Sequence, residues 1–281
     1  MSKTYIAGFD GSPESRAAVD LAVRLARTEV GKVVAAHVYP YAAAAYWITV
    51  EAMRYDEIED DYLHDAEGLL AELELEGIEK RAVKSDSPAR GLHELAEELD
   101  AKLIAVGVTA RGPLGRLAPG SVATHLLHGA PCQVLVVPAG VSDSPMRTIG
   151  VAYDGREESQ VALHTAREMA ERLGARLVVI GARQPVRIPV PPMAPGMPDL
   201  VEEDRQQFET MLTRGAETVD GEYRMLMGDP GREIADASAD VDLLVTGSRG
   251  YGAVGSVLLG SVSRHLVDHA QCPVLVVPRR V

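Results

Sequence analysis

Residues 243–278 read LLVTGSRGYGAVGSVLLGSVSRHLVDHAQCPVLVVP. The stretch begins with an apolar run, passes through a glycine-rich segment and continues into Val262–Ala270, whose apolar spacing is typical of an amphipathic helix. A second apolar run, Val274–Val277, follows. Strand, glycine loop and helix in this order predict a junction where backbone N–H groups and a helix N-terminus can bind a phosphate.

A degenerate copy of this stretch lies 140 residues earlier in the chain. Gly107–Pro138 aligns with Gly247–Pro278 without a gap, and 15 of the 32 positions are identical. The beginnings of the two copies also correspond, because an apolar run ends in Asp10-Gly11 in one and in Asp154-Gly155 in the other. A period this long indicates domain duplication rather than a solenoid. We therefore predict two domains, residues 1–140 and 146–281, joined by a short segment rich in Gly, Ser, Asp and Pro.

Each predicted domain has five short apolar runs separated by helical patterns. Continuous apolar, β-branched runs are typical of strands covered on both faces, and their alternation with helices predicts an α/β fold with a parallel sheet. Ser87-Pro88 and Asp229-Pro230 each precede a helical stretch. The predicted strands are Tyr5–Phe9, Val33–Val38, Arg81–Lys84, Leu103–Val106 and Val134–Val137, then Ile149–Tyr153, Leu177–Ile180, Arg224–Met227, Leu243–Val245 and Val274–Val277. Predicted helices include Ser15–Leu25, Val50–Glu76, Gln160–Leu173 and Asp199–Val219.

Composition and charge exclude several classes of protein. The 281 residues carry a net charge of −13, which argues against binding to nucleic acid or to an anionic membrane. No apolar run is long enough to span a bilayer and no signal-type segment opens the chain, so we expect a cytoplasmic protein. Cys132 and Cys272 occupy the same repeat position and are interpreted as small buried side chains. The acidic run Asp56–Asp65 is interpreted as a solvated helix face rather than a metal site.

The glycine-rich segment contains residue types that suit an anion. Gly247 ends a strand where a side chain would block a ligand, and Gly250 is expected at positive φ. Gly260 lets the backbone approach an anion at the helix start, where Ser261 can cap the helix or bind a phosphate. Arg249 can neutralise a phosphate or can simply be exposed. A glycine loop without any ligand is the alternative interpretation of the whole segment.

Other interpretations of the same residues carry less weight. Gly250–Gly255 reads G-x-G-x-x-G but follows the fourth strand of its domain and lacks the acidic residue about 20 positions further on, which disfavours a standard dinucleotide fold. No Walker phosphate-binding motif is present. Asp154 follows the first strand, where it can accept hydrogen bonds from a ribose or adenine, or serve only as a turn residue. His125 and His265 have no evident nucleophile beside them, so we predict no catalytic residue.

Taken together, these features resemble the universal stress protein family in a tandem, two-domain form, and specifically its ATP-binding branch. The resemblance is carried by the Asp-Gly pairs, by the spacing G-2x-G-9x-G-S in Gly247, Gly250, Gly260 and Ser261, and by the terminal run Cys272–Pro278. It implies two Rossmann-like domains of the adenine nucleotide alpha hydrolase-like type. Each would be a five-stranded parallel sheet of order 3-2-1-4-5 flanked by helices. It also implies that the last strands pair the two domains as a pseudo-dimer, and a homodimer of chains is a further option.

The resemblance also implies which residues hold the nucleotide, which we expect to be ATP with or without Mg. In the second domain these residues are Ala152, Asp154, Ile180, Gly247, Arg249, Gly250, Gly260, Ser261 and Val262. Their counterparts in the first domain are Asp10, Val38, Gly107, Gly112, Gly120 and Ser121. Because Ala110 replaces the second glycine and Pro119 removes an N–H group, we expect the first site to be weak or empty.

The function expected from these observations is that of an ATP-binding regulator or sensor of the stress response, with at most slow ATP hydrolysis. Its expected partners are adenine nucleotide and itself. Two alternatives stay open. One is a protein-interaction module that needs no nucleotide, because neither repeat shows an acid–base pair, a nucleophile triad or a metal cluster. The other is a weak ATPase, although no catalytic base is evident.

Overall fold

The computed structural model describes residues 3–40, 55–108, 121–138, 140–141, 145–184, 197–248 and 260–278. For residues 55–58, 121 and 197–200 it describes the backbone alone. The chain divides near residue 142 into two compact units, called unit 1 and unit 2 below. Both are α/β, as the alternation of apolar runs and helical patterns predicted.

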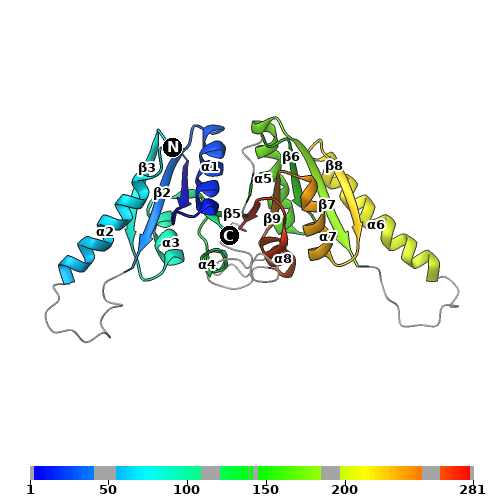
Figure 1. The fold of residues 1–281 in the computed structure, drawn as a ribbon. Helices are drawn as coiled ribbons and strands as arrows, with labels where there is room; N and C mark the ends of the chain where they lie inside the picture. Colours follow the sequence, from blue (N-terminus) through cyan, green and yellow to red (C-terminus); the bar gives the residue numbers. More distant parts are fainter. Residues whose placement is uncertain are drawn as a thin grey trace. The chain divides into compact units, whose positions relative to one another are not determined.

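Unit 1 is drawn in blue to green in Figure 1. Its described elements are β1 (Thr4–Gly8), α1 (Pro13–Arg27), β2 (Lys32–Tyr39), α2 (Tyr55–Ala71), β3 (Ile78–Lys84), α3 (Pro88–Glu98), β4 (Ala101–Gly107), α4 (Ser121–Leu127) and β5 (Gln133–Val137). The strands pair in parallel in the order β3-β2-β1-β4-β5. This is the expected order 3-2-1-4-5.

Unit 2 repeats this architecture, in green to red in Figure 1. Its described elements are β6 (Thr148–Ala152), α5 (Glu157–Leu173), β7 (Arg176–Arg183), α6 (Met197–Glu217), β8 (Glu222–Met227), α7 (Pro230–Ala237), the 3-10 turn η2 (Ser238–Asp240), β9 (Leu243–Gly247), α8 (Ser261–His269) and β10 (Val274–Val277). The parallel order β10-β9-β6-β7-β8 is the same arrangement. All ten strands expected from the sequence are therefore present.

The central strands are covered on both faces. Ile6 and Ile104 in unit 1, and Ile149 and Leu243 in unit 2, have no solvent exposure. Neighbouring residues on a strand point to opposite faces, and Phe9, just beyond β1, lies under the guanidinium group of Arg16 on α1, 5.6 Å from the ring centre. Gly8 faces the other way, where a Cβ would lie 3.0 Å from Leu92 on α3. Helices α1 and α3 therefore cover opposite faces of the sheet.

Several helices begin where the sequence predicts a cap. Ser87 Oγ accepts the backbone N–H of Arg90 (3.3 Å) at the start of α3. Asp229 Oδ1 accepts the N–H of Arg232 (3.1 Å) at the start of α7. Each cap precedes a proline at the first helical position, where a missing N–H costs nothing. These caps fix where the helices leave the carboxyl ends of the strands.

The burial of the two cysteines and the apolar character of the helices can both be compared with the expectations from composition. Cys132 and Cys272 are free thiols and both are buried, as predicted. Burial raises the pKa of each thiol to about 12. Within the described ranges, no helix combines the length and apolar character needed to cross a membrane.

Candidate functional site at the carboxyl edge of the second sheet

A cavity of about 260 Å³ opens in unit 2 at the carboxyl ends of β6, β7 and β9. The starts of α5, α7 and α8 close its other sides. Its lining residues are Ala152, Tyr153, Asp154, Arg156, Glu158, Ser159, Ala182, Pro230, Ile234, Thr246, Gly247, Gly260, Val262 and Ser263. Because the strand order reverses direction between β6 and β9, this is the place where open α/β sheets bind ligands.

Five of the residues expected to bind a nucleotide meet in this cavity: Ala152, Asp154, Gly247, Gly260 and Val262. They come from the end of β6 (Thr148–Ala152) and, far later in the sequence, from the end of β9 (Leu243–Gly247) and the start of α8 (Ser261–His269). The glycines and the Asp-Gly pair singled out in the sequence thus supply residues that line the same cavity. Their contact with a nucleotide stays a prediction.

The other expected residues of unit 2 have different surroundings. Ser261 is the exposed first residue of α8. Ile180 is fully buried and lines no part of the cavity, and its carbonyl oxygen accepts the N–H of Tyr153 at 2.9 Å. Ala182 on the same strand lines the cavity instead. Arg249 and Gly250 lie outside the described residues.

Asp154 forms a turn at the start of α5. Its Oδ1 accepts the backbone N–H of Arg156 at 3.1 Å, and its Oδ2 lies 3.6 Å from Nη1 of the same arginine. The side chain is half exposed and lines the cavity. The turn role, one of the two interpretations above, is therefore observed. A carboxylate has acceptor capacity beyond these two contacts, so the ligand role stays a prediction.

Gly247 is held by packing against α5. A Cβ on Gly247 would lie 2.4 Å from the carbonyl oxygen of Glu158. In unit 1 a Cβ on Gly107 would lie 2.3 Å from the carbonyl carbon of Glu14. Both distances are shorter than real Cβ atoms tolerate, so the fold alone requires glycine at both positions. This glycine therefore does not distinguish a ligand site from an empty one.

The charge at the mouth of the cavity favours an anion at α8 rather than at α5. Gly260 is the N-cap of α8 and provides no side-chain cap, and the first turn of α8 has no acidic residue. The first turn of α5 carries Glu157 and Glu158. Uncapped N–H groups at a helix start attract negative charge. Arg156, the N-cap residue of α5, also lines the cavity and adds a positive charge beside the carboxylate of Asp154.

A set of buried hydroxyl groups supports the end of β9. Ser263 Oγ donates to the carbonyl oxygen of Gly247 (2.6 Å) and lies 3.2 Å from Thr246 Oγ1. Ser248 Oγ is also buried and has no hydrogen-bond partner among the described residues. The sequence analysis did not single out these residues or Arg156. A signal was available in the differences between the two repeats. The positions of Thr246, Ser248, Ser263 and Arg156 are occupied in the first repeat by Val106, Val108, Ala123 and Ser12.

The expected residues of unit 1 are only partly described. Burial alone would raise the pKa of Asp10. Hydrogen bonds from Ser12 and Ser15 outweigh burial, so the pKa of Asp10 lies below its usual value. Val38 is half-buried, and a Cβ on Gly91 of α3 would lie 2.9 Å from it. Ser121 begins α4 and only its backbone is described. Gly112 and Gly120 lie outside the described residues.

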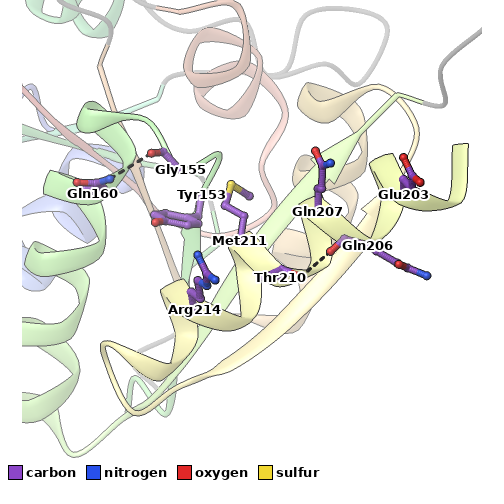
Figure 2. A pocket seen from close by; sticks show the side chains of 9 residues that line it. All are labelled: Tyr153, Gly155, Gln160, Glu203, Gln206, Gln207, Thr210, Met211 and Arg214. Carbon is purple, nitrogen blue, oxygen red and sulfur yellow. Dashed lines mark hydrogen bonds between the residues drawn. The ribbon is translucent and has the colours of Figure 1, made fainter. Parts of the chain in front are cut away.

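A larger cavity, about 660 Å³, opens beside α6 in the same unit. Figure 2 shows Tyr153 and Met211 between Gly155 and α6, with further polar side chains along the helix. The lining residues are Tyr153, Gly155, Gln160, Glu203, Gln206, Gln207, Thr210, Met211 and Arg214. Most of these are exposed α6 side chains rather than fixed backbone groups. The smaller cavity, which has strand ends and an uncapped helix start, is therefore the better candidate for an anionic ligand.

Histidine and metal chemistry contribute little to the candidate site. The ring of His265 stacks on that of His269 at a centroid distance of 4.0 Å. A Cβ on Gly231 of α7 would lie 3.0 Å from the side chain of His265. Burial, followed by the nearby His269, lowers the pKa of His265. Within the described part of the chain, no group of three or more His, Cys, Asp or Glu side chains could hold a metal ion.

The fold defines a class of protein with two tandem α/β units, the second of which has a crevice at the carboxyl edge of its sheet. The model of the universal stress protein family matches residues 1–138 and 145–278, and the chain belongs to this family. A universal stress protein of Mycolicibacterium smegmatis is 29% identical over 296 residues, covering 98% of this chain and 97% of that protein. One from Mycobacterium tuberculosis is 29% identical over 290 residues, covering 96% and 95%.

A solved structure supports the same architecture. The crystal structure of a universal stress protein from Archaeoglobus fulgidus matches with a TM-score of 0.71 and covers 100% of both chains. The sequence identity is 21%, so this likeness shows the fold alone. The tandem two-domain form of the family, which the sequence resemblance implied, is therefore confirmed.

Proposed function

We propose that this chain is an ATP-binding regulator or sensor of the stress response, in which unit 2 holds the nucleotide. The observation that carries the proposal is the cavity at the ends of β6, β7 and β9, because it gathers Ala152, Asp154, Gly247, Gly260 and Val262. The resemblance to the universal stress protein family had implied these residues from the sequence. Binding at this position follows the general behaviour of open α/β sheets.

The size of the cavity fits part of a nucleotide. At about 260 Å³ it lies just below the range of about 300–1,000 Å³ that is usual for small-molecule sites. Apolar side chains of Ala152, Ala182, Ile234 and Val262 line it, which suits a base or sugar. The uncapped start of α8 and the Arg156 guanidinium suit the phosphate groups at its mouth. Bound Mg would screen the phosphates without needing a dedicated protein cage.

A rival function is an interaction module that works without nucleotide. It is favoured by the packing of Gly247 against Glu158, since this glycine would be needed even if no ligand ever bound. The rival predicts that partner proteins are recovered equally well with and without ATP. The proposed function predicts that recovery changes with ATP and that Gly260→Val removes this dependence.

The direct test of the proposal is mass spectrometry of small molecules released from freshly purified protein. We expect adenine nucleotide at up to one equivalent per chain, and we expect it to be lost in the Gly260→Val variant. Protein that carries no nucleotide and gives no heat on titration with excess Mg-ATP would contradict the proposal. Slow turnover that disappears in Asp154→Asn would add weak ATPase activity to the same site.

A further inference from the structure

Strand β9 and helix α8 are joined by a buried hydrogen bond at the two ends of the glycine-rich segment. Gly247 is the last residue of β9 and Ser263 is the third residue of α8. Ser263 Oγ donates to the Gly247 carbonyl oxygen at 2.6 Å, and Ser263 is only 5% exposed. The bond therefore fixes the spacing between the segment's entry and exit whatever lies between them.

A second hydroxyl group completes this contact. Thr246 Oγ1 lies 3.2 Å from Ser263 Oγ, and Thr246 is also buried. Ser263 gives its only hydroxyl hydrogen to the Gly247 carbonyl, and the Thr246 hydroxyl lies within reach of two acceptors, Ser263 Oγ at 3.2 Å and the Gly247 carbonyl oxygen at 3.4 Å. The two hydroxyl groups and the Gly247 carbonyl therefore form one buried hydrogen-bonded cluster. Chains of hydrogen bonds in a low-dielectric interior strengthen one another.

Unit 1 has no hydroxyl groups at these positions. The equivalents of Thr246 and Ser263 are Val106 and Ala123, both buried. Unit 1 reaches the same fold with this apolar pair, so the hydroxyl groups of unit 2 are not needed to build the β9–α8 junction. Ser248 adds to the contrast, since its buried Oγ has no partner within the described part of the chain, whereas unit 1 has Val108 at this position. A buried hydroxyl group without a partner is unfavourable for stability, so its presence needs an explanation other than stability.

We propose that Thr246 and Ser263 are positioning residues that adapt unit 2, and not unit 1, to nucleotide binding; this rests on the proposed function. The bond satisfies the carbonyl of Gly247, a residue that lines the cavity, and so reduces the partial negative charge that would repel a phosphate there. It also holds the uncapped first turn of α8 at a fixed place beside Gly247. Pre-organising both groups reduces the ordering cost of binding.

The test is a double variant, Thr246→Val with Ser263→Ala, which reproduces the pair that unit 1 already accommodates. We expect its affinity for ATP, measured by titration calorimetry, to fall about 3- to 30-fold, as is usual for losing one or two hydrogen bonds. The single variant Thr246→Ser keeps both hydroxyl groups, because Ser263 is unchanged. It should bind ATP with most of the wild-type affinity. The thermal unfolding midpoint should change little, because unit 1 builds the same junction with the buried pair Val106 and Ala123.

The matched control is Ser238→Ala in the same unit. Ser238 Oγ is fully buried and donates to the Ala235 carbonyl at 2.6 Å, but it does not line the cavity. This variant should lower the unfolding midpoint and leave ATP affinity unchanged. Equal ATP affinity in wild type and double variant, or an equal loss in Ser238→Ala, would overturn the positioning role while the proposed function stands. A wild-type protein that binds no ATP would overturn both.

Discussion

Gly247 comes so close to the first turn of α5 that a Cβ atom would lie 2.4 Å from the carbonyl oxygen of Glu158. The same relationship joins Gly107 to Glu14 in unit 1. Both contacts are backbone against backbone, so no side-chain rotation can relieve them. The first glycine of the nucleotide-type motif is thus explained by packing in both units. Its replacement cannot be used as evidence for ligand contact.

We therefore expect Gly247→Ala to destabilise the protein by about 3 kcal/mol, at the upper end of the cost of overpacking. Gly107→Ala should cost a similar amount. The measurement is the free energy of unfolding in urea. Gly68→Ala on α2 is the control, since no described group outside the local helix backbone lies within 4 Å of its added Cβ, and it should stabilise by about 0.5–1 kcal/mol. If Gly247→Ala were as stable as wild type, the packing explanation would be wrong.

Arg156 gives a prediction in which stability and affinity change in opposite directions. Arg156 is the N-cap of α5 but makes no side-chain cap, whereas Ser12 at the same place in unit 1 accepts the N–H of Ser15. Arg156→Ser should therefore stabilise unit 2 by about 0.5–1 kcal/mol. It should also weaken ATP binding about 3- to 10-fold, with a smaller difference at high salt.

Calorimetric titration at two salt concentrations, with a thermal melt, checks both parts. Arg167→Ser is the control, because Arg167 lies further along α5 and pairs with Glu171. It should leave ATP affinity unchanged. A variant of Arg156 that binds ATP as tightly as wild type would remove this arginine from the candidate site.

The carboxylate of Glu29 should make the stability of unit 1 depend on pH in the acid range. Burial alone would raise its pKa, but hydrogen bonds and charges from Lys102 and Lys3 outweigh burial and lower the pKa from 4.5 to about 2. A depressed carboxylate pKa stabilises the fold above the unfolded value, and this contribution is lost as pH falls through the folded value. Glu29→Gln should therefore cost about 1–2 kcal/mol at pH 7 and almost nothing at pH 2.

Urea unfolding across this pH range measures the effect. Glu202 on α6 is the control, since hydrogen bonds from Arg205 and Gln206 lower its pKa to about 2 as well, but its side chain is exposed. Solvent screens an exposed pair, so Glu202→Gln should change stability little at any pH. A constant gap between wild type and Glu29→Gln from pH 7 to pH 2 would contradict the assignment.

The two cysteines report on the core of each unit. Cys132 and Cys272 are buried with their thiol pKa values raised to about 12, so at pH 8 each is protonated and shielded. The thiolate is the reactive form. Alkylation of native protein should be about a thousandfold slower or more than in denaturant, where both thiols react. Mass spectrometry counts the adducts, and rapid labelling of either native thiol would show that its surroundings are open.

The sequence was sufficient for the architecture because its signals are local. Continuous apolar runs marked the strands, and Ser87-Pro88 and Asp229-Pro230 marked two helix starts. Strand ends were less certain. The run Leu177–Ile180 stops where the apolar pattern stops, but β7 continues to Arg183. Since alternate residues share a face, the cavity is lined by Ala182, two positions beyond Ile180.

The candidate site could be predicted where a local backbone position calls for a particular residue type, such as glycine at a strand end. It was less predictable where the contact forms between two separate elements. Asp154, Gly247 and Gly260 stand at strand ends or helix starts and were identified from spacing. Thr246 and Ser263 look like ordinary residues in sequence, and their role arises only when β9 and α8 meet. The expected pairing of the two units through their last strands stays a prediction.

The measurement that tests the central claim most directly is the stoichiometry of ATP binding per chain by titration calorimetry, in wild type and in two matched variants. We expect one site per chain, lost in Gly260→Val of unit 2 and retained in Gly120→Val of unit 1. Absence of binding in the wild type, or binding that survives Gly260→Val and disappears with Gly120→Val, would contradict the assignment of the nucleotide to unit 2.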